Sequence, residues 1–423
     1  MEYKLTYEDI GKKQVILLVI KALRLFDERL VEHGERVAFI TRKISEQIYD
    51  DSQIDKDKLL ILSVFHDIGA YKTELLDEML RFDNTDVFDH SLYGYLFLKY
   101  FTPLGKMSHV ILFHHTDNCQ YEKMDFMYKD YSNLIHLADT VDIAMLGGTK
   151  KEDLVKKLRN KAFDTEQVNI FEKLLTETTM FDDLNTDIYR QNVEIWGLGI
   201  DITIEEAIRY LKMLVYIIDF KSEVTVTHSI ITTMTSIFLA QKLSVPEERI
   251  GRVYLGAMLH DIGKIAIPKE ILESPNKLTP EQMEIMKKHV AYTEDVIRDL
   301  VPDDICEIAV SHHEKLDGSG YHRGLTGEQL SLEQRIVGVA DIISALMGKR
   351  SYKESFDKTT ILSIINDMAD QGFIDAEIVK TAEINYEEMA ESILKETKPV
   401  IEKYKQLQDE YRGRIQKHRL ETN

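Results

Sequence analysis

Apolar residues recur at steps of three, four or seven along most of the chain, which is the pattern of amphipathic helices. The first such stretch covers residues 13–48, and a new one begins at Ile204. From Tyr386 onward the chain is heavily charged but keeps apolar positions at helical spacing. This last segment predicts a long terminal helix that packs on the body of the protein or on a second subunit. We therefore expect an all-α fold.

Histidines and aspartates interrupt these apolar stripes at positions that repeat in both halves of the chain. The apolar runs 59–65 and 255–259 each end abruptly in a His-Asp pair. Counterparts lie at near-equal separations, since 260 minus 66 gives 194 and 341 minus 139 gives 202. Because order and spacing are both kept, we infer two copies of one helical domain. The counterparts are His33 and His228, His66-Asp67 and His260-Asp261, His90 and His289, His114-His115 and His312-His313, and Asp139 and Asp341.

The domain boundaries follow from these repeats and from the glycines between them. We expect one helical bundle over residues 1–145, a helical connector over 146–203, a second bundle over 204–385 and a terminal helix over 386–423. Gly147-Gly148 predicts a break in the chain, and the segment 196–199 predicts a loop. Each paired histidine motif continues the apolar spacing of the helix before it, so we expect it to face inward.

The repeated side chains indicate metal binding. Each half gathers five histidines and two aspartates from separate helices, which is more than one four-coordinate zinc requires. Two metals fit better, with Asp261 bridging them and the histidines divided between the ions. Nitrogen and oxygen ligands suit iron or manganese as well as zinc. The alternative is a metal that only ties helices together, and it stays open above all for the first half.

Composition narrows the range of partners. The chain has 423 residues and a formal net charge of −20, so long DNA or RNA is an unfavourable partner. A small anionic substrate remains compatible with the charge if cations are concentrated in one pocket. No apolar run approaches the roughly 20 residues that span a bilayer. Two cysteines make no disulfide framework, and the N-terminus has no signal-peptide layout, so we expect a cytoplasmic protein that does not bind membranes.

With these motifs in place, both halves resemble the HD phosphohydrolase superfamily. The second half is similar to the HD-GYP family of cyclic dinucleotide phosphodiesterases, over roughly residues 204–385. That likeness rests on HDIGK from His260, HHEKLDGSGYHRGLTG from His312 and ADIISALMGKRSY from Ala340. It implies two divalent metals, with iron or manganese favoured. The implied ligands are His228, His260, Asp261, His289, His312, His313 and Asp341. The first half offers a second candidate metal site: His33, His66, Asp67, His90, His114, His115 and Asp139.

The same resemblance suggests which residues contact the substrate. Lys264, three residues after Asp261, is implied to hold a phosphate oxygen and so to share the catalytic role of Asp261. The segment Asp317-Gly318-Ser319-Gly320-Tyr321, called the glycine-rich loop below, is expected to bring Gly320 and Tyr321 close to the ligand. The remaining candidate contacts to phosphate or base are cations in an otherwise acidic chain: Arg323, Lys349, Arg350 and Lys353.

The sequence departs from the family pattern in three ways. His322 stands where the family has proline, which removes a φ restraint and predicts a more mobile loop. Val224 stands where some members have a glutamate, which favours two metals over three. In the first half, Ala70 replaces the lysine and residues 116–119 replace the start of the glycine-rich loop. The first half therefore keeps the metal ligands without the substrate signature, as in a regulatory or scaffolding domain. Independent catalysis on another nucleotide is the less favoured alternative and stays open.

We interpret the chain as a metal-dependent phosphodiesterase that converts a cyclic dinucleotide to a linear dinucleotide or to mononucleotides. Cyclic di-GMP is the first expectation for the substrate, and 3',3'-cyclic GMP-AMP is the close alternative. A weakly active nucleotide-sensing module that signals through a partner belongs to a different class and also stays open. A general HD nucleotidase fits the motifs of the second half less well. A homodimer or a signalling-protein partner is compatible with the sequence.

Overall fold

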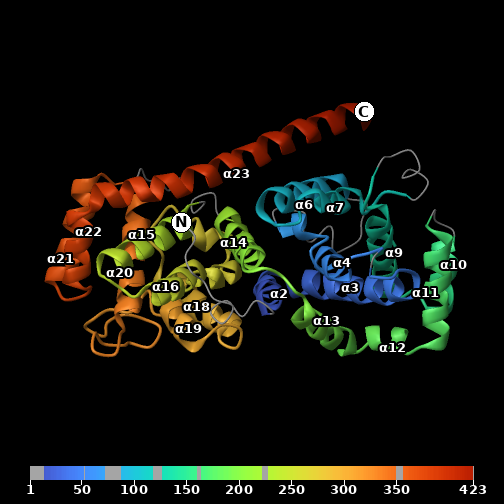
Figure 1. Ribbon diagram of the computed structural model, residues 1–423, viewed down its shortest axis with the longest axis horizontal. Coiled ribbons are helices and arrows are strands. Elements are labelled where there is room, and N and C mark those ends of the chain that lie inside the picture. Colours follow the sequence, from blue (N-terminus) through green and yellow to red (C-terminus); the bar gives the residue numbers. More distant parts are fainter. Residues whose placement is uncertain are drawn as a thin grey trace. The chain divides into compact units, whose positions relative to one another are not determined.

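The computed structural model describes residues 14–51, 53–71, 87–117, 126–159, 163–221, 227–348 and 356–422 (Figure 1). Helices dominate these ranges, and their only β pairing is an isolated bridge between Asp317 and Thr326. The expected all-α fold is confirmed. None of the described helices combines the length and the apolar character that crossing a membrane would require.

The chain divides into two compact units. The second-half unit comprises Met1–Phe26 and Thr203–Gln406, and the first-half unit comprises Asp27–Ile202 and Leu407–Asn423. Helix α2 (Val15–Phe26) packs with helices of the second-half unit although it precedes the first bundle in sequence. The long terminal helix is present as α23 (Tyr386–Thr422). The four domain boundaries given above stay predictions.

The second-half unit is built around four helices. Helix α15 packs against α16 and α20, and α19 packs against α16 and α20 in turn. Capping boxes start two of its helices: Thr279 with Gln282 begins α18, and Ser331 with Gln334 begins α20. Besides α2 and the part of α23 up to Gln406, the described elements of this unit are α14 (Ile204–Lys221), α15 (His228–Lys242), α16 (Glu247–Leu259), η4 (Ile262–Ala266), α17 (Lys269–Leu272), α18 (Pro280–Ile297), α19 (Asp303–Val310), α20 (Leu332–Met347), α21 (Lys358–Asp370) and α22 (Ala376–Ile384).

A close approach of η4 to α18 fixes the centre of this unit. A Cβ atom on Gly263 would lie 2.0 Å from the carbonyl oxygen of His289, so only glycine fits there. The Gly263 N–H donates to the Thr293 hydroxyl, which in turn donates to the carbonyl of His260, both at 3.0 Å. The segment that carries Asp261 is therefore locked to the helix that carries His289.

The first-half unit repeats this arrangement. Helix α3 packs against α4 and α9, η2 against α6, and α7 against α9, as α15, α16, α20, η4, α18 and α19 do in the other unit. The same close approach recurs, since a Cβ on Gly69 would lie 2.0 Å from the His90 carbonyl oxygen. These elements are α3 (Glu28–Ile48), α4 (Lys56–Val64), η2 (Ile68–Tyr71), α6 (Val87–Phe101), η3 (Gly105–Ser108), α7 (His109–Phe113) and α9 (Lys129–Leu146).

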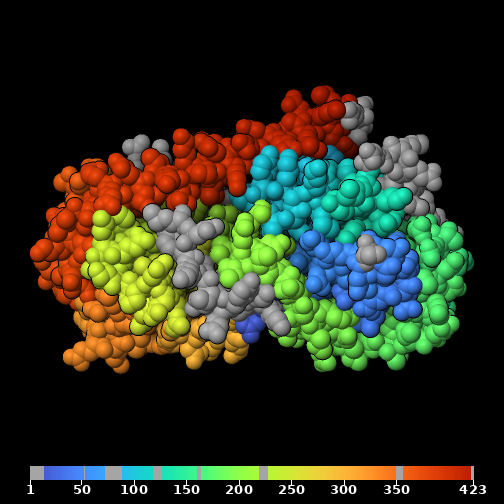
Figure 2. Space-filling view, viewed as in Figure 1, coloured from blue at the N-terminus to red at the C-terminus, as the bar shows by residue number. Residues whose placement is uncertain are grey.

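Four further helices complete the first-half unit: α10 (Lys151–Arg159), α11 (Thr165–Glu177), α12 (Met180–Leu184) and α13 (Ile188–Gly199). Figure 2 shows the side chains of α10 and α11, in green, at the outside of this unit. The break at Gly147-Gly148 is confirmed, because α9 ends at Leu146 and Gly148 has φ 78°.

The predicted loop over residues 196–199 is wrong, because these residues belong to α13. Trp196 stacks on Phe39 of α3 with ring centroids 5.9 Å apart, and Val193 is buried one turn earlier. Packing against α3 therefore outweighs the low helix propensity of the two glycines in this segment.

Candidate metal centres

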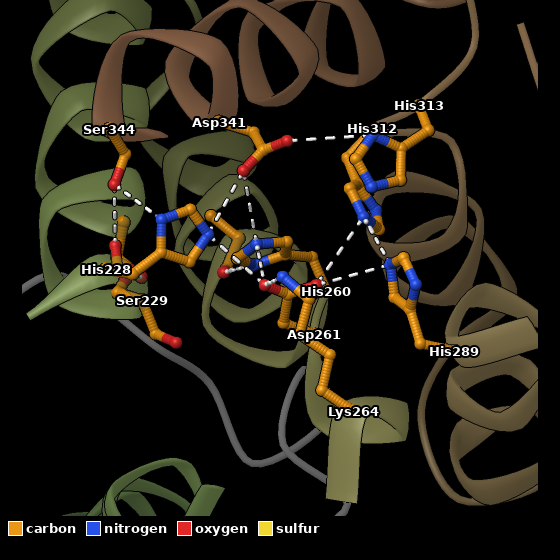
Figure 3. A network of polar contacts seen from close by, with 12 residues as sticks. His228, Ser229, His260, Asp261, Lys264, His289, His312, His313, Asp341 and Ser344 are labelled. Carbon is orange, nitrogen blue, oxygen red and sulfur yellow. Dashed lines mark hydrogen bonds and ion pairs between the residues drawn. The ribbon is translucent and has the colours of Figure 1, made fainter. Parts of the chain in front are cut away.

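The structure brings the predicted metal ligands of the second half together (Figure 3). His228 opens α15, His260 and Asp261 lie between α16 and η4, and His289 lies on α18. Asp341 lies on α20, one turn before Ser344. The His312-His313 pair lies in the turn just beyond α19, so the helix ends three residues before His313, the last position of its apolar spacing. His312 is nevertheless 2% exposed, as an inward-facing position requires.

Asp261 stands between two groups of histidines. Its Oδ2 atom lies 3.2 Å from Nε2 of His228 and 3.1 Å from Nε2 of His260. Its Oδ1 atom lies 3.4 Å from Nε2 of His289 and 3.7 Å from Nε2 of His312. Asp341 approaches the first group through Oδ1, 3.1 Å from His228, and lies 3.8 Å from Nδ1 of His313 through Oδ2. One carboxylate thus faces each group with a different oxygen, as a bridging ligand does.

The backbone fixes which ring nitrogen of each histidine faces inward. A carbonyl oxygen only accepts hydrogen bonds, so a ring nitrogen bonded to one carries the proton. In three of these histidines Nδ1 donates to the carbonyl three residues earlier, which leaves the Nε2 lone pair directed into the space between the ligands. We call this group of ligands the cage; its members are His228, His260, Asp261, His289, His312, His313 and Asp341. The donors, acceptors and distances are His260 to Ala257 at 2.6 Å, His289 to Met286 at 2.7 Å, and His312 to Ala309 at 2.8 Å.

These lone pairs need a cation. The Nε2 atoms of His289 and His312 lie 3.2 Å apart, and neither carries the proton that a hydrogen bond between them would use. Among the described residues, Nε2 of His228, Nε2 of His260 and Oδ1 of Asp261 are buried without a hydrogen-bond partner. Buried polar atoms left in this way are costly, and a divalent cation satisfies all of them. The donor set therefore fits a metal centre with iron-, manganese- or zinc-type ligands.

Electrostatics divides the cage into two parts. Burial lowers the pKa of His289 to about 3 and that of His313 to about 4, which keeps these imidazoles neutral, as metal ligands must be. Burial also opposes charge on His260, but the Asp261 and Asp341 carboxylates outweigh it and raise the pKa of His260 to about 10. The part of the cage around His228 and His260 therefore attracts positive charge, which a metal ion supplies when it binds.

Two predicted substrate contacts lie beside the cage. The Lys264 ammonium pairs with Oδ2 of Asp261. The Tyr321 ring lies against His313, with ring centroids 4.6 Å apart, and burial raises the pKa of its phenol. Gly320 allows this approach, because a Cβ there would lie 2.5 Å from Cα of Glu314. The glycine-rich loop therefore rests directly on the histidine pair.

Glu314 and His322 hold this loop in place. Oε1 of Glu314 accepts the N–H groups of His322 at 3.1 Å and Arg323 at 2.6 Å, and Oε2 accepts that of Leu325 at 2.9 Å. Nε2 of His322 also contacts Glu294 at 2.6 Å. The proline expected at this position could not donate the first of these bonds. The prediction of a loosened loop therefore overlooked two attachments that take the place of the missing ring.

The remaining predicted contacts are further from the cage or outside the described residues. The Arg323 guanidinium pairs with Glu294 and Glu307, so these carboxylates compete with a phosphate for it. Lys349, Arg350 and Lys353 lie outside the described residues, as do Val224 and Cys119.

The first-half unit holds its predicted ligands in the same arrangement. Oδ2 of Asp67 lies 3.7 Å from Nε2 of His33 and 3.5 Å from Nε2 of His66. Oδ1 of the same carboxylate lies 3.5 Å from Nε2 of His90 and 3.8 Å from Nε2 of His114. The other two predicted ligands, His115 and Asp139, lie 3.7 Å from each other, and His90 lies 3.0 Å from His115.

Sequence reasoning missed the residues that support the ligands. Ser344 lies three residues after Asp341 and bonds to His228, and Asp142 lies three residues after Asp139 and bonds to His33. A spacing of three places each on the same helix face as the aspartate, which was a signal available in the sequence. Thr293 gave no such signal, because its role depends on the contact between η4 and α18.

Comparison with known families agrees with this geometry. The HD domain family matches residues 30–144 and, in a second variant of the same domain, residues 212–378. The chain is a tandem HD-domain protein. Its second HD domain carries the HD-GYP-type signature, and its first is an HD domain without that signature.

Relatives of this HD-domain protein include two from Vibrio cholerae serotype O1. The chain is 26% identical to 3'3'-cGAMP-specific phosphodiesterase 1 over 88% of its own length and 90% of that protein. It is 30% identical to 3'3'-cGAMP-specific phosphodiesterase 3 over 56% of its length and 53% of that protein. The cyclic di-GMP phosphodiesterase response regulator RpfG of Xanthomonas campestris is 41% identical over 30% of the chain and 34% of that protein.

A solved structure shares the fold. The crystal structure of a cyclic GMP-AMP-specific phosphodiesterase of Vibrio cholerae, V-cGAP3, superposes with a TM-score of 0.55. That match covers 90% of this chain and 97% of the other at 18% sequence identity. At this identity the likeness concerns the fold alone.

Proposed function

We propose that the second HD domain hydrolyses a cyclic dinucleotide, with 3',3'-cyclic GMP-AMP as the first candidate substrate. An HD-GYP domain of this kind is a metal-dependent phosphodiesterase. The observation that carries the proposal is the position of Asp261, whose two carboxylate oxygens face two separate groups of histidines. Such a bridging carboxylate is what a two-metal phosphodiesterase needs at its centre.

The ligands of the second HD domain would form two groups, each holding one metal ion. One ion would be held by His228, His260 and Asp341, the other by His289, His312 and His313, and Asp261 would be shared. Metals held in this way lower the pKa of water and stabilise the charge that develops on a phosphoryl group. In the reaction a water oxygen adds to phosphorus and one P–O ester bond breaks. Opening one ester gives a linear dinucleotide, and opening both gives mononucleotides.

Lys264 is proposed to exchange its partner during the reaction. Its ammonium pairs with Asp261, and a phosphate oxygen offers the same charge-assisted contact. The equivalent residue in the first HD domain is Ala70, so Lys264→Ala gives this position the residue of the first copy. We expect kcat/KM to fall about 10- to 100-fold, because a hydrogen bond to a charged group contributes about 1.5–3 kcal/mol.

Steady-state hydrolysis by purified Lys264→Ala checks this prediction. Lys242→Ala, which removes a surface lysine paired with Glu388, serves as the matched control and is expected to keep wild-type kinetics. A Lys264→Ala variant with wild-type kcat/KM would remove the lysine from the proposed mechanism.

Glu314 is proposed to position the glycine-rich loop. Glu314→Ala removes the acceptor of three backbone N–H groups at once, so the loop that presents Tyr321 should lose its fixed geometry. We expect kcat/KM to fall about 10- to 100-fold, because misplacing a substrate-contacting group by about 1 Å has effects of this size. Glu314→Gln keeps one oxygen acceptor and should fall between the wild type and the alanine variant.

Kinetics of both variants, with metal content measured in parallel, test the role of the loop. Equal kcat/KM for Glu314→Ala and the wild type would exclude it. Loss of metal together with activity would point to a structural role for Glu314 instead.

The choice of substrate follows the relatives with the widest coverage. The relative aligned over 88% of this chain is named as specific for 3'3'-cGAMP, whereas those named as cyclic di-GMP phosphodiesterases align over 27–38% of it. This reverses the order of preference from the sequence alone, which placed cyclic di-GMP first. Cyclic di-GMP remains the second candidate, because a relative named for it is 41% identical over 130 residues.

The first HD domain is proposed to bind metal and to regulate or support the second. It keeps a full set of ligands around Asp67, but it has Ala70 in place of the lysine. A partner or a second copy of the chain remains part of this proposal.

Product analysis tests the function. Purified protein loaded with manganese or ferrous iron is incubated separately with 3',3'-cyclic GMP-AMP and cyclic di-GMP, and nucleotides are separated by chromatography. We expect faster conversion of the mixed dinucleotide. Faster conversion of cyclic di-GMP would reverse the substrate assignment. Tight binding without turnover under either metal would replace the enzyme with a nucleotide sensor.

A further inference from the structure

The two HD domains differ in what stands behind one equivalent histidine. His33 and His228 are counterparts at a separation of 195, and the residues three positions later are Arg36 and Ile231. Asp139 and Asp341 are counterparts at a separation of 202, and three positions after them stand Asp142 and Ser344. The first domain therefore has an ion pair with a buried carboxylate where the second has a hydroxyl and an apolar side chain.

In the second domain the partner of His228 is neutral. The Ser344 hydroxyl lies 2.9 Å from the carbonyl oxygen of His228 and 2.9 Å from its Nδ1 (Figure 3). Because a hydroxyl has one proton and the carbonyl must receive it, Ser344 accepts from the Nδ1–H group. This hydrogen bond directs Nε2 into the cage, but the acceptor carries no charge.

In the first domain the partner of His33 is a carboxylate. Asp142 is 1% exposed, and its Oδ2 lies 2.7 Å from Nδ1 of His33. Arg36 donates to both oxygens of Asp142, from Nε at 2.5 Å and from Nη2 at 3.0 Å. The guanidinium also lies over the Tyr189 ring, 5.7 Å from its centroid. Asp142 on α9 is thus held by two side chains of α3, and it keeps His33 in one orientation.

The two domains also differ in the charge beside the shared aspartate, at the position of Lys264 in the second domain and Ala70 in the first. Lys264 places an ammonium against Oδ2 of Asp261, on the side that faces His228. In the first domain Ala70 is buried at the equivalent position and brings no charge. In the first domain the carboxylates of Asp67, Asp139 and Asp142 and the guanidinium of Arg36 sum to a formal charge of −2. In the second domain the carboxylates of Asp261 and Asp341 and the ammonium of Lys264 sum to −1.

We propose that Asp142 and Arg36 make the first HD domain the tighter of the two metal sites, at the position beside His33 and His66. A carboxylate behind a metal-binding histidine fixes its tautomer and raises its strength as a ligand. The proposal rests on metal binding by both cages, which belongs to the proposed function. Its consequence is that the first domain keeps its ion under conditions that remove ions from the second. The first domain then acts as a lasting structural or regulatory element, while the second exchanges its ions.

Titration of the metal-free full-length chain with manganese tests this order of affinities. Free manganese is measured by its electron paramagnetic resonance signal. We expect a tight class of sites and a weaker class. Asp67→Ala should remove the tight class, and Asp261→Ala should remove the weaker one. The reverse assignment would overturn the proposal.

Asp142→Asn tests the contribution of the carboxylate charge behind His33. Asparagine keeps the shape and one oxygen acceptor but removes the charge, so we expect about 10- to 100-fold weaker binding in the tight class alone. Arg36→Ile combined with Asp142→Ser copies the second domain and leaves no unpaired guanidinium, and it should weaken the same class. Ser344→Ala is the matched change in the second domain and should leave the tight class unaltered.

The outcomes separate this proposal from the proposed function. Circular dichroism and thermal unfolding show whether Asp142→Asn is folded. If the folded variant binds manganese in the tight class as strongly as the wild type does, the proposal is overturned, even if hydrolysis persists. An equal loss of affinity in both classes overturns it as well. Two classes of sites in a chain that hydrolyses no cyclic dinucleotide would contradict the proposed function and leave the order of affinities standing.

Discussion

Asp261→Ala is expected to lower the rate of cyclic dinucleotide hydrolysis by about 1,000-fold, or to background. Asp261 is 4% exposed, and its two oxygens face the two groups of histidines in the second HD domain. Alanine leaves neither group with the shared ligand, so both ions should bind more weakly and the stabilisation of phosphoryl charge should be lost. Single-turnover hydrolysis at saturating manganese, with metal content measured on the same sample, checks this result.

Two other aspartates serve as controls for that variant. Asp304→Ala removes a carboxylate that pairs with Arg252 away from the cage, and hydrolysis should stay at the wild-type rate. Asp67→Ala makes the same change in the first HD domain, and its activity should fall far less than that of Asp261→Ala. If Asp67→Ala loses as much hydrolysis as Asp261→Ala, the assignment of catalysis to the second domain is wrong.

Gly263→Ala should both destabilise the second HD domain and disperse its metal ligands. The added Cβ would lie 2.0 Å from the His289 carbonyl oxygen and 2.6 Å from the Thr293 nitrogen, and both are backbone atoms. Because backbone yields less easily than a side chain, η4 must move away from α18 and take Asp261 with it. We expect a loss of about 1–3 kcal/mol or more in the free energy of unfolding, together with weaker metal binding.

Denaturant unfolding with and without manganese measures both effects of Gly263→Ala. Gly413→Ala is the matched control, because a Cβ there meets nothing within 4 Å and the residue lies inside α23. Alanine at that position should stabilise the chain by up to about 1 kcal/mol through helix propensity. A Gly263→Ala variant with wild-type stability and full metal content would show that the contact between η4 and α18 is not needed.

The candidate site was largely predictable because its ligands repeat. His66-Asp67 and His260-Asp261 each end an apolar run, and a hydrophobic stripe fixes which way a helical side chain points. Helix α13 was not predictable in this way, since its two glycines indicate a loop until the stacking of Trp196 on Phe39 is known. Local propensity gave the wrong result there because a tertiary contact decided the conformation.

Residues that act through other residues were harder to identify. Glu314 stands next to a metal-ligand pair in the sequence, yet only the folded loop shows that its carboxylate accepts three backbone N–H groups. Arg323 was expected at the substrate because it is a cation in an acidic chain, and the fold places Glu294 and Glu307 beside it. A charge in the sequence does not reveal its partner when the partner lies on another helix.

Anomalous diffraction at the manganese edge, from crystals of the manganese-loaded protein, tests the central claim most directly. The account predicts two manganese peaks in the second HD domain on opposite sides of the Asp261 carboxylate. One should lie beside His228, His260 and Asp341, and the other beside His289, His312 and His313. A single peak that Asp261 does not touch, or peaks away from these side chains, would contradict it.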